Sequence, residues 1–200
     1  MKILKEKEAE DFLAKKGFSV AKRAVFFDKE DAFKFAHKIG FPVVLKVTNA
    51  LHKTDVGGVM IVDKYDFYIK FNKLKEKSNQ ILVQEYVKGK EVILGFKKDP
   101  TFGYSIMFGL GGVLVEIFED VSFRVCPVSR EDAIKMIREI KAYKILKGVR
   151  GDKPINFELL IKNILKLNKL TRLGIGELDI NPLIINDKEA KIVDARIILE

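Results

Sequence analysis

The chain has 200 residues, enough for one large domain or two small ones around a buried core. Its residues are 48% apolar and 32% charged, which excludes a disordered chain, and no apolar run reaches the roughly 18 residues of a membrane helix. The net charge of +9 is spread along the chain, so we expect anionic small ligands such as nucleotides, and no nucleic acid. The single cysteine, Cys126, excludes an internal disulfide, and the N-terminus has no signal-peptide pattern, so we expect a cytoplasmic protein without membrane contact.

In the first half of the chain, hydrophobic periodicity and capping residues predict helices that alternate with strands. A helix over residues 6–16 is stopped by Gly17. A second helix begins after its N-cap, Asp28, has Asp31 at the capping-box position, and ends at Gly40. The sequence then predicts, in order, a strand over 42–47, a strand over 58–62, a helix around 66–77 and a strand over 81–87.

In the second half, strands joined by turns predominate. Two strands meet at the turn Asp99-Pro100, and a further strand region extends through Val128. Ser129 and Asp132 form a capping box at the start of a helix. The ranges predicted here are strands over 91–99 and 104–110, a helix over about 157–171, and strands over 176–185 and 190–199.

This order of elements predicts the fold class. Strands and helices alternate early, whereas hairpins dominate later, which favours an α+β arrangement with mixed or antiparallel sheets over a doubly wound parallel sheet. The sequence contains no repeat of fixed period and no low-complexity linker, and its loosest internal segment is residues 147–154.

The last two predicted strands carry the most informative side chains. Because side chains alternate along a strand, Asp179 and Asn181 share one face of the first strand, and Asp194 and Arg196 share one face of the second. A turn centred on residues 186–189 pairs Asn181 with Asp194 and Asp179 with Arg196, about 5 Å apart at Cβ. An amide oxygen beside a carboxylate suits Mg²⁺ that also binds phosphates. A solvent-facing hairpin is the alternative, and a one-residue slip of the turn would abolish the pairing.

Further features favour a nucleotide site without the usual motifs. The chain lacks the G-x-x-x-x-G-K-[ST] phosphate loop and the G-x-G-x-x-G dinucleotide motif. It has Lys46 at the end of the apolar strand FPVVLKV, then His52 and the pair Gly57-Gly58 in the segment NALHKTDVGGV, and more glycines within 109–112. A lysine that extends to solvent and glycines that close loops are the structural alternatives. Taken with the hairpin, these features favour ATP bound without a P-loop.

These residues resemble an ATP-grasp domain and, more specifically, the β subunit of the ADP-forming (NDP-forming) acetyl-CoA or acyl-CoA synthetases. The matching segments run in the family's order from about residue 8 to the C-terminus: GFPVVLKV, LHKTDVGGV, ILVQEYVKGKEVILGFKKDPTFG, IMFGLGGVLVEIFEDVSFR, ELDINPLI and VDARI. LHKTDVGGV is the most specific of them, because the corresponding loop of succinate–CoA ligases lacks this histidine pattern. Tyr104 departs from the family, which has proline there.

The resemblance implies a role for each matching position. The reactive residue would be His52, as a phosphohistidine. The remaining assignments are Lys46, Gly57, Gly58 and Arg124 toward nucleotide phosphates, Glu85 and Val87 at the adenine hinge, Glu91 at the ribose, and Asn181 and Asp194 as ligands of Mg²⁺.

The resemblance also implies the reaction, in which acyl-CoA, ADP and phosphate give a carboxylic acid, CoA and ATP. Phosphate would pass from an acyl phosphate to a histidine of a partner α subunit, then to His52 and then to ADP. A neutral imidazole nitrogen is a competent nucleophile near pH 7. The α subunit would carry the CoA and acyl sites in an α2β2 heterotetramer, with Mg²⁺ as cofactor and ATP or ADP as substrate.

The implied architecture is one ATP-grasp domain over residues 1–200, of the α+β class, with nucleotide bound between two subdomains. We expect the smaller subdomain at about residues 20–95 and the remainder, with the hairpin, at 1–19 and 96–200. Two other functions remain as alternatives. A succinate–CoA ligase-like β subunit is disfavoured by His52, and a non-catalytic nucleotide-binding regulatory subunit is disfavoured by the intact set of candidate site residues.

Overall fold

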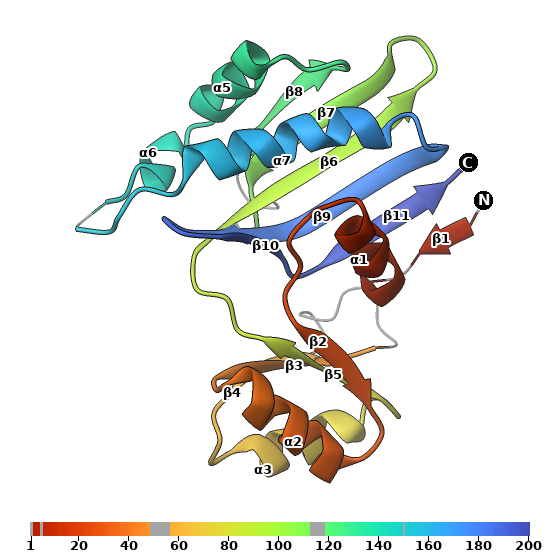
Figure 1. The fold of residues 1–200 in the computed structure, drawn as a ribbon, viewed down its shortest axis with the longest axis vertical. Helices are drawn as coiled ribbons and strands as arrows, with labels where there is room; N and C mark the ends of the chain where they lie inside the picture. The colour runs from red at the N-terminus through yellow and green to blue at the C-terminus, as the bar shows by residue number, and fades with distance from the viewer. Residues whose placement is uncertain (1, 5, 49–56, 113–118, 150) are drawn as a thin grey trace. The chain divides into compact units, whose positions relative to one another are not determined.

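The computed structural model divides the chain into two compact units. It describes residues 2–4, 6–48, 57–112, 119–149 and 151–200. The smaller unit is Ala21–Val87, and the larger unit combines Met1–Val20 with Lys88–Glu200 (Figure 1). Strand β6 (Lys90–Asp99) pairs within the larger sheet, so the smaller unit ends before residue 95, the approximate limit that the sequence suggested.

The larger unit is built on a seven-stranded sheet. Its elements are β1 (Lys2–Leu4), α1 (Glu6–Lys15), β6, β7 (Gly103–Leu110), β8 (Val121–Val125), α5 (Arg130–Glu139), α6 (Tyr143–Leu146), α7 (Phe157–Leu170), β9 (Ile175–Ile185), β10 (Ala190–Ile192) and β11 (Ala195–Leu199). The strand order is β1-β11-β9-β6-β7-β8, with β10 also paired to β9, and these pairs are antiparallel. Antiparallel pairing agrees with the predicted class, and short turns join two of the pairs, β6 with β7 and β9 with β10.

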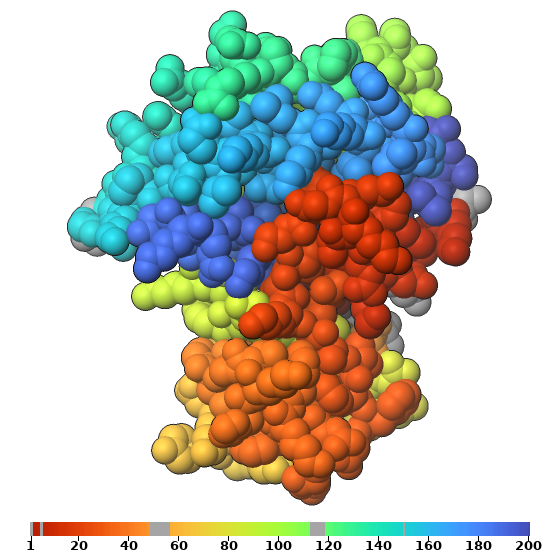
Figure 2. Space-filling model, in the orientation of Figure 1, coloured from red at the N-terminus to blue at the C-terminus, as the bar shows by residue number. Residues whose placement is uncertain are grey.

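Helices α1, α5 and α7 cover one face of this sheet (Figure 1). In the space-filling view, α7 and α1 form much of the surface on that side of the larger unit (Figure 2). Alternate side chains of each central strand are buried beneath these helices, with Leu94 and Phe96 from β6, Ile106 and Phe108 from β7, and Leu178 and Ile180 from β9. Each such side chain contributes roughly 1.5–3 kcal/mol, so the burial determines which face of each strand points to the core.

The smaller unit is a four-stranded antiparallel sheet with two helices. Its elements are β2 (Arg23–Phe26), α2 (Lys29–Ile39), β3 (Val43–Val47), β4 (Val59–Val62), α3 (Phe67–Lys75) and β5 (Ile81–Glu85), with strand order β2-β5-β3-β4. Phe67 is fully buried in the core between sheet and helices, where its ring contacts Phe33 edge-on and stacks on Phe71. This aromatic packing gives the unit its own hydrophobic core.

Two of the predicted helix starts are confirmed in atomic detail. The Asp28 carboxylate accepts the N–H groups of Glu30 and Asp31 at the start of α2. Ser129 and Asp132 form a reciprocal capping box at the start of α5. These short polar side chains satisfy N–H groups that a helix leaves without a partner at its first turn.

The strand region predicted to reach Val128 ends earlier, at Val125. Cys126 N–H still donates to Tyr104 O at 2.7 Å, but Pro127 has no N–H with which to continue the ladder. The N–H of Val128 donates instead to Asn168 Oδ1 of α7 at 2.9 Å. Among the described residues, no helix has both the length and the apolar content required to cross a bilayer.

Candidate functional site

Lys46 and the pair Gly57-Gly58 are neighbours at one end of the smaller sheet. Lys46 is buried on β3. Leu45 and Val47 point into the core beneath the helices, so alternation places the Lys46 side chain on the opposite face. Val47 N–H donates to Gly58 O at 2.9 Å, which brings the glycine pair beside this strand. His52 lies outside the described residues.

Glu85 and Val87 lie at the end of β5 and just beyond it. The Glu85 carboxylate accepts the N–H of Lys22 at 3.0 Å, and Glu85 N–H donates to Lys22 O at 2.8 Å. This reciprocal pairing ties the end of β5 to the residue before β2. Because the Glu85 side chain already serves the main chain of Lys22, a hinge contact to adenine would fall to the main chain of this segment.

The hairpin that joins β9 to β10 and β11 has the predicted register. Asn186 N–H donates to Glu189 O at 3.0 Å across the turn, and Asn181 N–H donates to Asp194 O at 3.1 Å. Asp179 stands opposite Arg196. Ala195 and Ile197 are buried in the core, so Asp194 and Arg196 share the other face of the sheet, which points away from α5 and α7. We call this second face the site face.

A bulge in β9 lies at Asn181. Between β6 and β9 the register shifts, because Val92 pairs with Leu183 whereas Leu94 pairs with Ile180. The extra residue of β9 falls at Asn181 and Pro182, and such bulges commonly re-aim side chains at functional sites.

Gly112, just after β7, contacts both Asn181 and Glu91. Gly112 N–H donates to Asn181 Oδ1 at 3.4 Å. A Cβ atom at Gly112 would lie 2.1 Å from Glu91 Oε2, and its φ of +70° also favours glycine. The structure thus gathers Glu91, Gly112 and Asn181 from β6, the end of β7 and β9.

Asp179 is the most perturbed acid of the site face. Burial raises the pKa of its carboxyl to about 6, and repulsion from Asp194 adds to the rise, whereas Arg196 opposes it. The Oδ1 atom is buried and makes no hydrogen bond to any described residue. A buried carboxylate oxygen without a partner is costly, so this atom is suited to meet a cation or a donor that a ligand brings.

The donor set of the hairpin fits Mg²⁺. It offers the amide oxygen of Asn181 and the carboxylates of Asp194 and Asp179, all hard oxygen ligands. Within the described ranges, no three His, Cys, Asp or Glu side chains are grouped to hold a metal on their own. Mg²⁺ binds proteins through one or two carboxylates and completes its shell with water and substrate phosphates, so a smaller protein set suffices.

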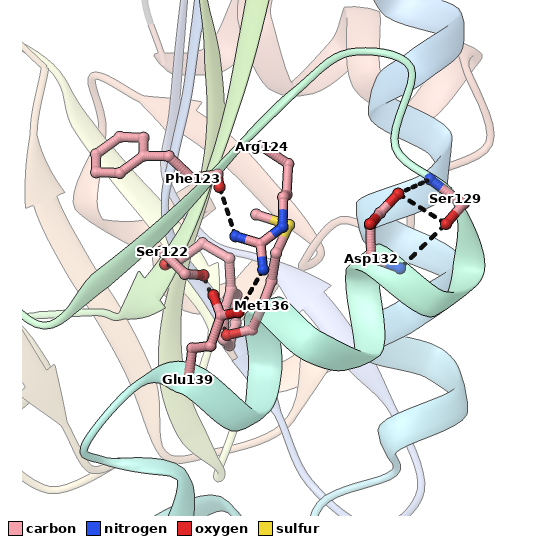
Figure 3. A network of polar contacts seen from close by, with 8 residues as sticks. Ser122, Phe123, Arg124, Ser129, Asp132, Met136 and Glu139 are labelled. Atoms are coloured by element: carbon pink, nitrogen blue, oxygen red, sulfur yellow. Dashed lines mark hydrogen bonds and ion pairs between the residues drawn. The ribbon is translucent and has the colours of Figure 1, made fainter.

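Arg124 lies apart from these groups. On β8 it pairs with Ile106 of β7, in the row of side chains that α5 and α7 cover. Figure 3 shows its guanidinium donating to Phe123 O at 2.7 Å and pairing with Glu139 of α5. Two strands, β7 and β6, separate β8 from β9, so the structure does not bring Arg124 to the hairpin.

Some of the residues assigned from the sequence come together in the structure, and one does not. Within the larger unit, Glu91, Asn181 and Asp194 come together, whereas Arg124 does not. The family motif implied no role for Asp179 or Arg196, although side-chain alternation had already placed both on the site face. It implied no contact for Gly112 either, and no local pattern could have done so, because that contact depends on pairing between distant strands.

Known proteins resemble this chain over nearly its whole length. The sequence matches the ATP-grasp domain family over residues 1–199. It is 43% identical to the β subunit of acetate–CoA ligase (ADP-forming) I of Pyrococcus furiosus, covering 98% of this chain and 91% of that protein. It is 40% identical to acetate–CoA ligase (ADP-forming) I of Archaeoglobus fulgidus, covering 92% of this chain but 29% of that longer protein.

A solved structure gives the same result for the fold. It is acetyl-coenzyme A synthetase 1 of Ca. Korarchaeum cryptofilum in complex with coenzyme A and Mg-AMPPCP, with its phosphohistidine segment pointing towards the nucleotide binding site. The TM-score is 0.85 at 43% identity, and the match covers 100% of this chain and 93% of that one. The chain therefore belongs to the ATP-grasp family and, within it, to the group of the β subunits of ADP-forming acetate–CoA ligases.

Proposed function

We propose that this chain is the ATP-grasp β subunit of an ADP-forming acyl-CoA synthetase, an acid–thiol ligase that makes ATP from acyl-CoA, ADP and phosphate. The observation that carries the proposal is the hairpin register, which sets Asn181 against Asp194. It occurs in a chain that is 43% identical over 98% of its length to such a β subunit. Acetate is the acid named for that relative, and it is the first substrate to test.

In this proposal each unit contributes its own groups. In the smaller unit, Lys46 and the N–H groups of Gly57 and Gly58 bind nucleotide phosphates, and the segment Glu85–Val87 contacts adenine. In the larger unit, Glu91 contacts the ribose, and Asn181 and Asp194 hold Mg²⁺, which supplies charge neutralisation for the phosphates when bound. The phosphate role that the resemblance implied for Arg124 stays a prediction, and it would require the guanidinium to leave Glu139 and the main chain of Phe123.

His52 is the proposed phosphoryl carrier. An imidazole nitrogen of His52 attacks the phosphorus of the phosphohistidine on the partner, so that one P–N bond forms as the other breaks. A β-phosphate oxygen of ADP then attacks the phosphorus on His52, which breaks the second P–N bond and returns the neutral imidazole. LHKTDVGGV carries this assignment, and the phosphohistidine segment named for the Ca. Korarchaeum cryptofilum structure supports it.

We infer that the partner is an α-type subunit with the CoA and acyl sites, in an α2β2 assembly in the cytoplasm. The support is that some relatives are separate β subunits, whereas others are single chains of which this sequence matches 29–30%. A succinate–CoA ligase-like β subunit and a regulatory subunit without turnover are disfavoured by the 43% identity to the acetate–CoA ligase β subunit.

The isolated chain should bind ATP or ADP with Mg²⁺ and should not turn over acyl-CoA until an α-type subunit is added. Calorimetry measures the first property, and an acyl-CoA-dependent ATP assay with candidate α subunits measures the second. The proposal fails if the chain binds no nucleotide, or if it makes ATP from acyl-CoA by itself.

Substitution of Asn181 or Asp194 by Ala should each weaken Mg²⁺-dependent nucleotide binding, by about tenfold or more, because each removes an oxygen ligand. The double variant should lose less than the product of the two factors, since both residues act through one ion. Titrations of nucleotide in Mg²⁺ and in EDTA measure these losses. Asp187→Asn, in the exposed turn, is the matched control, and strictly multiplicative losses would argue against a shared ion.

Asp179→Asn should stabilise the metal-free protein at neutral pH. A folded-state pKa of about 6, above the ordinary 3.8, means that the stability that Asp179 contributes in its protonated form is lost as pH rises from about 4 through 6. The gain from Asn should therefore be small near pH 4.5 and on the order of 2–3 kcal/mol near pH 7.5. Urea unfolding at both pH values measures it. Asp187→Asn should give no such gain, because Lys153 lowers the pKa of Asp187.

His52→Asn should abolish phosphoryl transfer and leave nucleotide affinity within a few-fold, because the amide keeps hydrogen-bonding capacity but has no nucleophilic ring nitrogen. With γ-labelled ATP and Mg²⁺, the wild-type chain should form an acid-labile, alkali-stable phosphoprotein, and the variant should not. His37→Asn serves as the control. Substantial ATP synthesis by His52→Asn together with its α partner would end the carrier role.

A further inference from the structure

Arg196 is placed to reach a ligand bound at Asn181 and Asp194. It follows Asp194 by two residues on the same face of the hairpin, so their Cα atoms are about 6–7 Å apart. Its side chain is 47% exposed. The long arginine side chain can span the distance from Arg196 to a ligand at Asp194. Arg196 therefore lies next to the proposed cation ligands within the larger unit.

The donors of Arg196 are little used within the chain. Within the part of the chain that the structure describes, its ion pair is a single contact of 3.9 Å to Glu177 Oε1, and Glu177 is shared with Lys97 at 3.6 Å. Exposed contacts of this length contribute little. A guanidinium offers five N–H donors in a planar fork that matches phosphate oxygens in pairs, so most of this capacity remains for a ligand.

The row of side chains that contains Arg196 includes a glycine on a neighbouring strand. Asp179 faces it across the hairpin, and Gly95 of β6 is next in the same row, so the position beside the carboxylate has no side chain; the row continues with Met107 of β7. A Cβ atom at Gly95 would lie 2.4 Å from Leu178 O, so the backbone itself requires glycine at this position. Asp179 stands opposite Arg196 and keeps one carboxyl oxygen buried without a partner among the described residues.

The order of groups along the site face gives the ligand a direction. Glu91, the proposed ribose contact, is in register with Ile184 of β9. Asn181 follows toward the N-terminal end of β9, and the row of Asp179 and Arg196 comes next. A nucleotide whose ribose meets Glu91 and whose phosphates share the cation of Asn181 therefore extends its terminal phosphate toward Arg196.

We propose that Arg196 binds the terminal phosphoryl group of the nucleotide and so favours ATP over ADP at this site. The inference rests on the proposed function, since it takes Mg²⁺–nucleotide as the ligand. It assigns to Arg196 the contact that the sequence reasoning gave to Arg124, whose guanidinium lies on the other face of the sheet.

The test compares the affinities for ATP and ADP, each with Mg²⁺, of the full chain by calorimetry. Arg196→Gln should weaken ATP binding by about ten- to hundred-fold, the strength of a charge-assisted pair, and ADP binding by no more than about threefold. Arg196→Lys should give an intermediate loss for ATP, because the charge is kept and the planar fork is lost. Lys97→Gln, which removes an exposed cation that pairs with the same Glu177, is the matched control and should change neither affinity.

Two results would overturn the inference while leaving the proposed function intact. One is an equal loss, or no loss, for ATP and ADP in Arg196→Gln. The other is a selective loss of ATP in Arg124→Gln instead, which would return the phosphate contact to β8. If the wild-type chain binds neither nucleotide with Mg²⁺, the proposed function itself fails. Thermal unfolding followed by circular dichroism confirms that each variant is folded.

Discussion

The antiparallel register of the hairpin β9–β10–β11 is the constraint on which the candidate site depends. The Asn186 carboxamide closes the turn by accepting N–H groups of Lys188 and Glu189 at 2.8 and 2.9 Å. If the pairing of β9 slipped by one residue, Asn181 would point toward the core, and the apolar side chains of Leu178 and Ile180 would point to the opposite face. Burial of those side chains resists the slip, so the same apolar contacts that stabilise the larger unit also hold the polar pair in place.

The site face has an electrostatic arrangement that serves binding better than stability. Asp179 and Asp194 repel each other, and burial of Asp179 makes its charged form still less favourable. An arrangement of this kind is stable only because the surrounding sheet is well packed, and it is relieved by a cation. Local unfavourable terms of this sort are characteristic of functional sites, where they are offset by packing elsewhere in the fold.

The two arginines show how a sheet separates chemistry by face. Arg124 and Arg196 belong to strands of the same sheet, yet Arg124 lies under α5, paired with Glu139, and Arg196 lies on the site face. Arg124 also donates to the main-chain carbonyl of Phe123 on β8, which has no outer strand partner among the described residues. A guanidinium there satisfies a main-chain group and anchors a helix, both of which are structural roles. From the sequence alone, an arginine in these roles cannot be told from one that binds phosphate.

The sequence alone was sufficient for features that depend on local rules. The caps at Asp28 and Ser129 follow from helix termini, and the pairing of Asn181 with Asp194 follows from side-chain alternation about a four-residue turn. The tertiary structure decided what depends on contacts between strands far apart in the chain. The bulge between β6 and β9, the approach of Gly112 to Asn181 and the face on which Arg124 lies are all of this kind. They result from which strands pair and how the core fills, and no short window of sequence contains that information.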